Sequence, residues 1–141
     1  MTTIDEALEG STPLAEKARA AGPYRSSPEL VARMRSIVRQ LSEAEKIATL
    51  NAHPRIGERP DRLSARSLQE QGADALPELD RLNAEYERRF GFRFVVFVNR
   101  RSKAEILEVL RRRIDRSREE EMDDGLGAVV DIAEDRLAED R

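Results

Sequence analysis

Hydrophobic residues recur at helical spacing in three long stretches of this chain, residues 27–41, 77–90 and 118–138. In each stretch they advance by three or four positions, so they fall along one face of a helix and leave the opposite face polar. The apolar positions are Leu30, Met34, Ile37, Val38 and Leu41; Leu79, Leu82, Tyr86 and Phe90; and Met122, Leu126, Val129 and Ala133. The pattern predicts three amphipathic helices packed around one core.

Helix starts and stops divide the rest of the chain. Thr12-Pro13 and Ser27-Pro28 each place a capping hydroxyl before a proline that opens a helix. A serine followed three residues later by glutamate is a capping box. The capping boxes are Ser42 with Glu45, Ser102 with Glu105 and Ser117 with Glu120, and Ser64 is expected to cap a short helix over residues 65–76. Gly22 and Gly91 are predicted stops, and Pro54 ends a helix at His53.

The apolar run "FRFVVFV", residues 92–98, fits either a buried strand or an extended connection. A lone strand in a helical chain would have no partner, so we predict an extended segment. We therefore expect an all-α fold, with residues 1–141 forming a single compact domain of about six to eight helices and one short extended segment.

Composition agrees with this fold and excludes several functions. Few aromatic residues (4%) and many charged ones (38%) favour helix over sheet. A net charge of −3 gives no general attraction to nucleic acid or to anionic membranes. The chain has no cysteine, which excludes disulfide and thiolate chemistry, and no apolar run of membrane-spanning length. "MTTIDEALEG" does not resemble a signal peptide. We predict a soluble, cytoplasmic protein.

His53 is the only histidine and stands in "NAHPRIGER", where Pro54 stops a helix. At a helix C-terminus the dipole favours the protonated imidazole, and a titrating imidazole in a loop suits general acid–base chemistry. The alternative is a solvated loop histidine. No second histidine, cysteine or ligand spacing accompanies it, so we expect no metal site.

Three polar residues in "SARSLQEQG" are spaced to share one helix face: Ser67, Glu70 and Gln71. A hydroxyl, a carboxylate and a carboxamide placed together can hold a small ring that bears amide-type N–H and C=O groups. The alternative is a capped helix start with exposed polar side chains.

Arg136 falls on the inward stripe of the last predicted helix, three residues after Ala133. A buried guanidinium requires an anion. The anion is either a structural carboxylate such as Glu70 or the carboxylate of a substrate, held bidentately. Alternatively, the helix end is exposed and Arg136 extends into water. The arginine clusters at residues 88–89, 100–101 and 111–113 have acidic neighbours and no interleaved aromatic residues, so we interpret them as surface.

Five motifs in this order resemble the successive signatures of the OHCU (2-oxo-4-hydroxy-4-carboxy-5-ureidoimidazoline) decarboxylase family. They are "NAHPRIGER", "SLQEQ", "LNAEYERRFGFRFVVFV", "SKAEILEVLRRRI" and "DIAEDRL", and the resemblance covers roughly residues 7 to 138. It implies an all-helical, cofactor-free carboxy-lyase, often a homodimer. This enzyme removes CO2 from a ureido-imidazoline at the end of oxidative urate breakdown and delivers (S)-allantoin. Association with urate oxidase and 5-hydroxyisourate hydrolase, which act before it, is also expected.

The same resemblance implies roles for individual residues. His53 matches the catalytic histidine, which exchanges a proton with the substrate hydroxyl, and Pro54 shapes its loop. Glu70 and Gln71 match the pair that binds the ureido and ring amide groups. The remaining predicted contacts to substrate are Ser67, the backbone of Phe94, Val95 and Val96, and Arg136.

The chain departs from the family pattern at several places. Arg93 replaces a proline in "FGFRF", Leu14 replaces a tryptophan, and the loop "HPRIGERP" is more basic. Part of the helix that usually precedes "EGS" is expected to be absent. Two alternatives therefore accompany the decarboxylase: a paralogue acting on another ureido or hydantoin compound, and a non-catalytic helical module that binds a small molecule. Convergence of His53, Glu70 and Arg136 on one cavity would distinguish an enzyme from the module, and Arg93 filling that cavity would favour the paralogue.

Overall fold

The computed structural model describes residues 2–55 and 77–139, and these residues form seven helices and no strand. The helices are α1 (Ile4–Ala7), α2 (Pro13–Ala21), α3 (Ser27–Gln40), α4 (Glu43–Asn51), α6 (Pro77–Phe90), α7 (Lys103–Arg113) and α8 (Arg118–Ala138). The predicted all-α fold class is confirmed. No helix in these two ranges is both long and apolar enough to cross a membrane.

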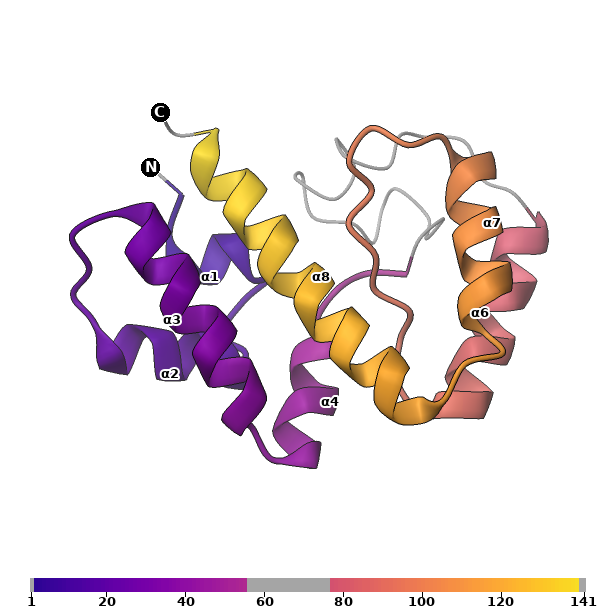
Figure 1. Cartoon of the computed structure of the whole chain (residues 1–141), viewed down its shortest axis with the longest axis horizontal. Coiled ribbons are helices and arrows are strands. Elements are labelled where there is room, and N and C mark those ends of the chain that lie inside the picture. The colour runs from indigo at the N-terminus through magenta and orange to yellow at the C-terminus, as the bar shows by residue number, and fades with distance from the viewer. Residues whose placement is uncertain (1, 56–76, 140–141) are drawn as a thin grey trace.

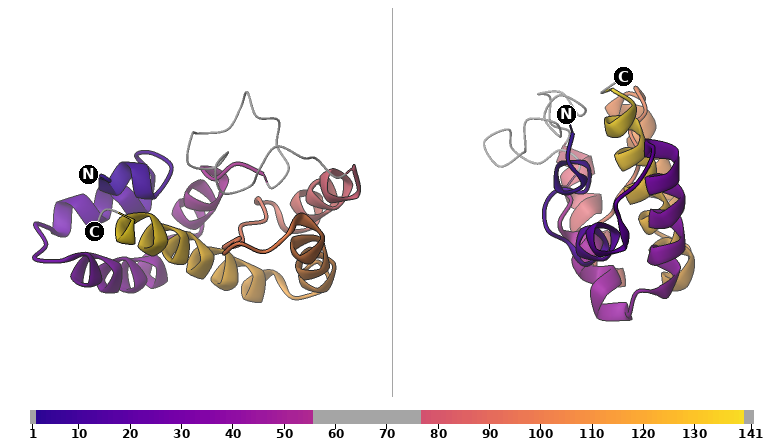
Figure 2. Two further views of the ribbon diagram at one scale, coloured as in Figure 1. Left: turned by 90° about the horizontal axis from the view of Figure 1, so that it is seen from above. Right: turned by 90° about the vertical axis from the view of Figure 1, so that its left-hand side faces the viewer.

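Helix α8, with 21 residues, runs diagonally through the molecule and joins its two ends (Figure 1). Helices α1, α3 and α4 pack against it, and α2 packs against α1, α3 and α4. Helices α6 and α7 pair at the other end, where α8 begins (Figures 1 and 2). As a result, the C-terminal half of α8 lies beside the N-terminal segment of the chain.

The helix caps follow the sequence closely. Thr12 caps α2, and the predicted capping boxes of α4, α7 and α8 are all formed. The prediction for α3 was wrong by one residue, because Ser26, not Ser27, accepts the N–H of Glu29 at 3.3 Å. Helix α1 was not predicted, although Thr3 and Glu6 form a capping box that the sequence displays.

The predicted apolar stripes form the core. Every stripe position is buried except Leu82, which is half-buried. The segment after α6 is extended, as predicted, and buries Phe92, Phe94, Val95 and Val96. Gly91 starts this segment with a φ of +84°, a backbone conformation that residues with a side chain rarely adopt. The helix therefore ends at Phe90 and the chain turns back across the core.

Helices α4 and α8 approach each other closely at Gly125. A Cβ atom at position 125 would lie 2.8 Å from Cδ2 of Leu50, which is fully buried, whereas a Cβ at Gly127 would meet nothing within 4 Å. The missing side chain at position 125 therefore lets α4, whose end carries His53, sit directly against α8.

Gly125→Ala is expected to be less stable than Gly127→Ala by about 1–3 kcal/mol, because the added methyl forces Leu50 out of its packed position. Gly127→Ala is the matched control in the same helix and should gain up to about 1 kcal/mol from helix propensity. Chemical denaturation of both variants measures the difference. Equal free energies of unfolding would contradict the close approach.

Candidate active site

His53 lies just beyond the end of α4, in the turn that Pro54 closes. Its backbone N–H donates to the Leu50 carbonyl at 3.2 Å, and its side chain is only 4% exposed. Within residues 2–55 and 77–139, neither ring nitrogen makes a hydrogen bond of regular geometry, although the Thr49 backbone interacts weakly with the ring. The alternative of a solvated loop histidine is therefore wrong, because the imidazole is inside the protein.

Burial lowers the pKa of His53 from 6.5 to about 4. The Glu9 carboxylate raises this pKa, the Arg136 guanidinium lowers it, and the Thr49 backbone raises it more weakly. The expectation that the helix dipole would favour a protonated imidazole was wrong, because the loss of hydration outweighs the dipole. At neutral pH the imidazole is uncharged and able to accept a proton.

The stability of the protein is expected to fall as the pH drops from about 6.5 to about 4. In this window the unfolded chain binds a proton at His53 and the folded chain does not, so protonation favours unfolding. The full effect of such a shift is on the order of 3 kcal/mol. Because the chain has one histidine, NMR of histidine-labelled protein reports its pKa directly. Urea unfolding at pH 7 and pH 4.5, compared with His53→Asn, isolates the contribution. A pKa near 6.5, or equal pH dependence in both proteins, would contradict the prediction.

Arg136 is buried on the inward face of α8, as its spacing predicted, with a residue exposure of 1%. Its Nη2 pairs with Oε1 of Glu9 at 2.7 Å. Its Nη1 donates to the carbonyls of Glu6 and Ala7, at the end of α1, at 3.4 and 3.3 Å. The alternative of an exposed guanidinium is wrong. Its carboxylate partner among the described residues is Glu9, which is a structural carboxylate as one alternative predicted, while Glu70, the residue named as the example, lies outside the described residues.

Glu9 reaches Arg136 from a left-handed backbone turn. Its φ is +64°, and the following Gly10 has a φ of +123°. A non-glycine residue in this region is uncommon and is retained where surrounding contacts enforce it. Sequence reasoning missed Glu9 because the Glu–Gly pair signals only a turn. His53, Glu9 and Arg136 nevertheless share one electrostatic environment, formed by the ends of α1, α4 and α8.

Arg55 and Arg93 join the turn that contains His53 and Pro54, called the histidine turn below, to α6 and to the extended segment. Arg55 makes a bidentate pair with Glu87 of α6, with N–O distances of 2.6 and 2.7 Å. Arg93 donates from Nη1 to the carbonyls of Asn51 and His53 at 3.1 and 3.0 Å. Arg93, which departs from the family pattern, thus directs its guanidinium to the backbone of the histidine turn.

The predicted site residues of the extended segment, which follow Arg93 in the sequence, are buried. Phe94, Val95 and Val96 are 1%, 3% and 6% exposed. The Val95 carbonyl accepts a hydrogen bond from Nη1 of Arg113 at 3.2 Å, and Arg113 also lies over the Phe94 ring. Ser67, Glu70 and Gln71 lie outside the described residues, so their predicted roles remain predictions. Pro54 is half-buried next to His53.

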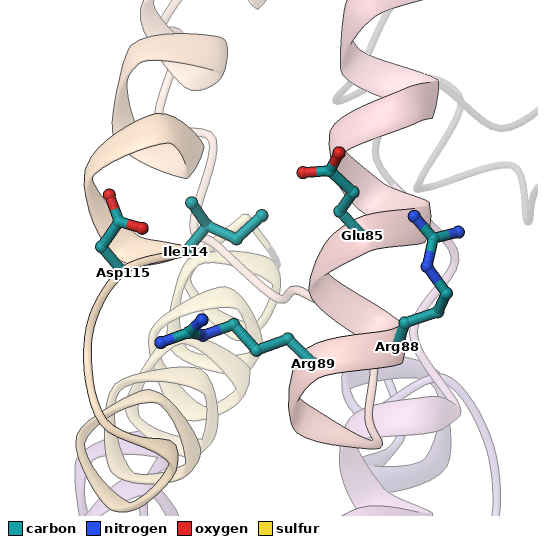
Figure 3. A pocket seen from close by; sticks show the side chains of 5 residues that line it. All are labelled: Glu85, Arg88, Arg89, Ile114 and Asp115. Carbon is teal, nitrogen blue, oxygen red and sulfur yellow. The ribbon is translucent and has the colours of Figure 1, made fainter.

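A separate hollow lies between α6 and the turn after α7 (Figure 3). It is lined by Glu85, Arg88, Arg89, Ile114 and Asp115, and its charged residues are exposed and of both signs. None of the predicted site residues lines it. This hollow is therefore separate from the His53 region, where a buried imidazole lies near a buried ion pair.

Comparison with known proteins gives a consistent result along the whole chain. A model of the OHCU decarboxylase family matches residues 1–138. A 2-oxo-4-hydroxy-4-carboxy-5-ureidoimidazoline decarboxylase of Haloferax volcanii is 36% identical over 95% of this chain and 84% of its own length. The uric acid degradation bifunctional protein PucL of Bacillus subtilis is 30% identical over 97% of this chain, which spans 29% of that larger protein.

Two solved structures share the fold. A crystal structure of OHCU decarboxylase in the presence of (S)-allantoin superimposes with a TM-score of 0.71, at 28% identity, over 92% of this chain and 90% of the other. A crystal structure of (S)-allantoin synthase gives a TM-score of 0.69, at 26% identity, over 97% of this chain and 48% of the other.

Proposed function

This chain belongs to the OHCU decarboxylase family, and from that premise we propose how its residues act. It is a carboxy-lyase that decarboxylates 2-oxo-4-hydroxy-4-carboxy-5-ureidoimidazoline in urate degradation. The observation that carries the mechanism is a buried imidazole with a lowered pKa, set beside the ion pair of Glu9 and Arg136.

The substrate itself accepts the electrons of the reaction. When the bond between the ring carbon and the carboxylate breaks, CO2 leaves, the electron pair forms a C=C bond to the neighbouring ring carbon, and the C=N electrons move onto the ring nitrogen, which takes up a proton from solvent. The substrate hydroxyl then loses its proton as a ring C=O forms, and the neighbouring ring carbon is protonated. The protein's part is to orient the carboxylate, accept the proton and restrict protonation to one face. Because the substrate supplies the electron sink, we expect the reaction to need no cofactor.

His53 is the group that takes the proton from the hydroxyl. A general base must be unprotonated before the reaction, and the low pKa of His53 keeps its ring neutral at pH 7. Its ring nitrogens have no hydrogen bond of regular geometry within the described residues, and the weak interaction with the Thr49 backbone favours the protonated ring, so no described donor competes for the lone pair. A site that excludes water also strengthens every charge interaction within it.

Arg136 is proposed to bind the substrate carboxylate, sharing its guanidinium between that group and Glu9. The backbone around Phe94 to Val96 would line the site, and Ser67, Glu70 and Gln71 would bind the ureido and ring amide groups. These assignments rest on the match to the family motifs. Protonation on one face would yield (S)-allantoin, the compound present in the related crystal structure.

We also propose a cytoplasmic homodimer that works alongside the enzymes that act before it. The bifunctional relatives support this association, since in them a region similar to this chain is part of a larger uric acid degradation protein. Multi-angle light scattering of the purified protein measures the subunit number.

The test is formation of optically active allantoin. Substrate is generated in situ from urate with urate oxidase and 5-hydroxyisourate hydrolase, and circular dichroism follows the product, with a chelator present. We expect rapid appearance of the (S)-allantoin signal, while samples without the protein show only slow, racemic decay. Background decay in both samples would overturn the assignment and favour a paralogue or a binding module. Activity lost on chelation would overturn the cofactor-free mechanism.

A further inference from the structure

The imidazole of His53 depends on its backbone for its position. Within residues 2–55 and 77–139 neither ring nitrogen has a hydrogen bond of regular geometry, and the Thr49 backbone interacts with the ring only weakly, so polar contacts among these residues do little to fix it. Its placement follows from packing and from the two peptide groups that flank its Cα. The groups that hold these peptides therefore decide where the base points.

The N-terminal side of His53 is held within α4, where its N–H donates to the Leu50 carbonyl. The C-terminal side cannot be held by continuing the helix, because Pro54 has no N–H to donate. The last carbonyls of a helix need other donors. Here the carbonyls of Asn51 and His53 both accept from Nη1 of Arg93, at 3.1 and 3.0 Å.

The contact between Arg93 and the turn is reciprocal. The backbone N–H of Arg93 donates to Oδ1 of Asn51 at 2.9 Å, so three hydrogen bonds join these two segments. A guanidinium at a helix C-terminus also complements the partial negative charge of the carbonyls there. Arg93 belongs to the extended segment that continues into Phe94 and Val95, so the same contact sets the histidine turn against that segment.

We propose that Arg93 and Asn51 form a clamp that positions His53 for proton transfer. The proposal rests on the proposed role of His53. Arg93 is a positioning residue, not a catalytic one: it acts on the backbone of His53 and not on the substrate. Displacement of a catalytic group by about 1 Å costs on the order of a hundredfold in rate, so loss of the clamp should lower kcat more than it changes KM.

Arg93→Met tests the clamp, because methionine keeps the length of the side chain and removes its donors. We expect kcat to fall about 10- to 100-fold, with KM changed less than about threefold. The midpoint of the pH profile should stay within about 0.5 units, because Arg93 is not among the groups that shift the pKa of His53. Arg93→Lys should recover part of the loss, since an ammonium can still donate to one carbonyl. Arg88→Met is the matched control, because Arg88 is an exposed arginine that lines the separate hollow between α6 and the turn after α7.

Asn51→Ala removes only the hydrogen bond from the Arg93 backbone, and Asn51→Asp keeps an acceptor oxygen there. We expect a loss of about 3- to 10-fold in kcat for alanine, with partial rescue by aspartate. The losses of Asn51→Ala and Arg93→Met should not multiply in the double variant, because both act on one turn.

NMR of the single histidine tests, without any substrate, whether the clamp positions the His53 ring. The His53 ring signals should shift or broaden in Arg93→Met and stay unchanged in Arg88→Met, at a temperature where both proteins are fully folded. Unchanged signals and wild-type kcat in Arg93→Met would overturn the proposal. A loss of kcat that follows thermal stability, without rescue by lysine, would reduce Arg93 to a structural role. If the wild type does not decarboxylate, the proposed function fails while the NMR comparison still tests the clamp.

Discussion

His53→Asn is expected to lower kcat by about 10²–10⁴-fold, the range that general acid–base catalysis supplies. Asparagine is close to histidine in size and can still form hydrogen bonds, but it cannot accept a proton. Because the base is replaced and the contacts that hold the carboxylate are not, KM should change far less than kcat. The rate of (S)-allantoin formation, followed by circular dichroism at saturating substrate, measures the effect.

The same variant provides its own control for folding. His53 is neutral in the folded protein at pH 7, so replacing it removes no charge interaction there. His53→Asn should therefore stay folded at pH 7 and lose less stability on acidification than the wild type. A folded His53→Asn with kcat within a few-fold of wild type would show that another group transfers the proton.

Glu121→Ala is expected to lower the free energy of unfolding by about 3–5 kcal/mol, the cost of breaking a buried ion pair by removing one partner. Glu121 is fully buried in α8. Its Oε1 pairs with Nε of Arg113 at 2.8 Å and accepts from the Tyr86 hydroxyl at 2.7 Å. Truncation leaves the buried guanidinium of Arg113 without this carboxylate and also leaves a cavity.

Glu121→Ala should also disturb the two elements that Glu121 contacts, α7 through Arg113 and α6 through Tyr86. Arg113 links α7 to the extended segment through the Val95 carbonyl, and Tyr86 belongs to α6. Burial raises the pKa of Tyr86, and the Glu121 carboxylate raises it further, so the phenol stays protonated and donates to Glu121. Loosening Arg113 therefore also loosens the segment that carries Phe94 and Val95.

Urea denaturation of Glu121→Ala beside Glu119→Ala measures this effect. Glu119 is an exposed glutamate in the first turn of the same helix, and its removal should cost less than about 1 kcal/mol. Glu121→Gln should fall between the two, because the amide oxygen still accepts from Tyr86 while the charge is lost. Similar stability of Glu121→Ala and Glu119→Ala would show that the contacts of Glu121 with Arg113 and Tyr86 contribute nothing to the free energy of unfolding.

Local features of this fold were predictable from sequence because they depend on neighbours within a few residues. Capping boxes, the stop at Gly91 and the apolar stripes all involve spacings of three or four positions. Among residues 2–55 and 77–139, the helix signals failed where two adjacent serines compete, at Ser26 and Ser27, and where a single turn forms α1. The extended segment was predictable by elimination, since a strand would have lacked a partner.

The candidate site depends on contacts that no local pattern encodes. Spacing alone placed Arg136 on the inward face of α8, but Glu9, which pairs with it, comes from the opposite end of the sequence. The sequence identified His53 and suggested a protonated ring, whereas burial among distant segments makes it neutral. Arg93 was seen only as a departure from a family pattern until the fold set it against the end of α4.

The sequence by itself determined the longer described helices, most of their ends, the inward faces and the family resemblance, because short-range hydrogen bonding and hydrophobic periodicity fix them. Tertiary structure alone decided the charge state of His53, the anion beside Arg136 and the donors that hold the histidine turn. These properties arise from desolvation and from charges brought close in space, and such proximity exists only once the helices have packed.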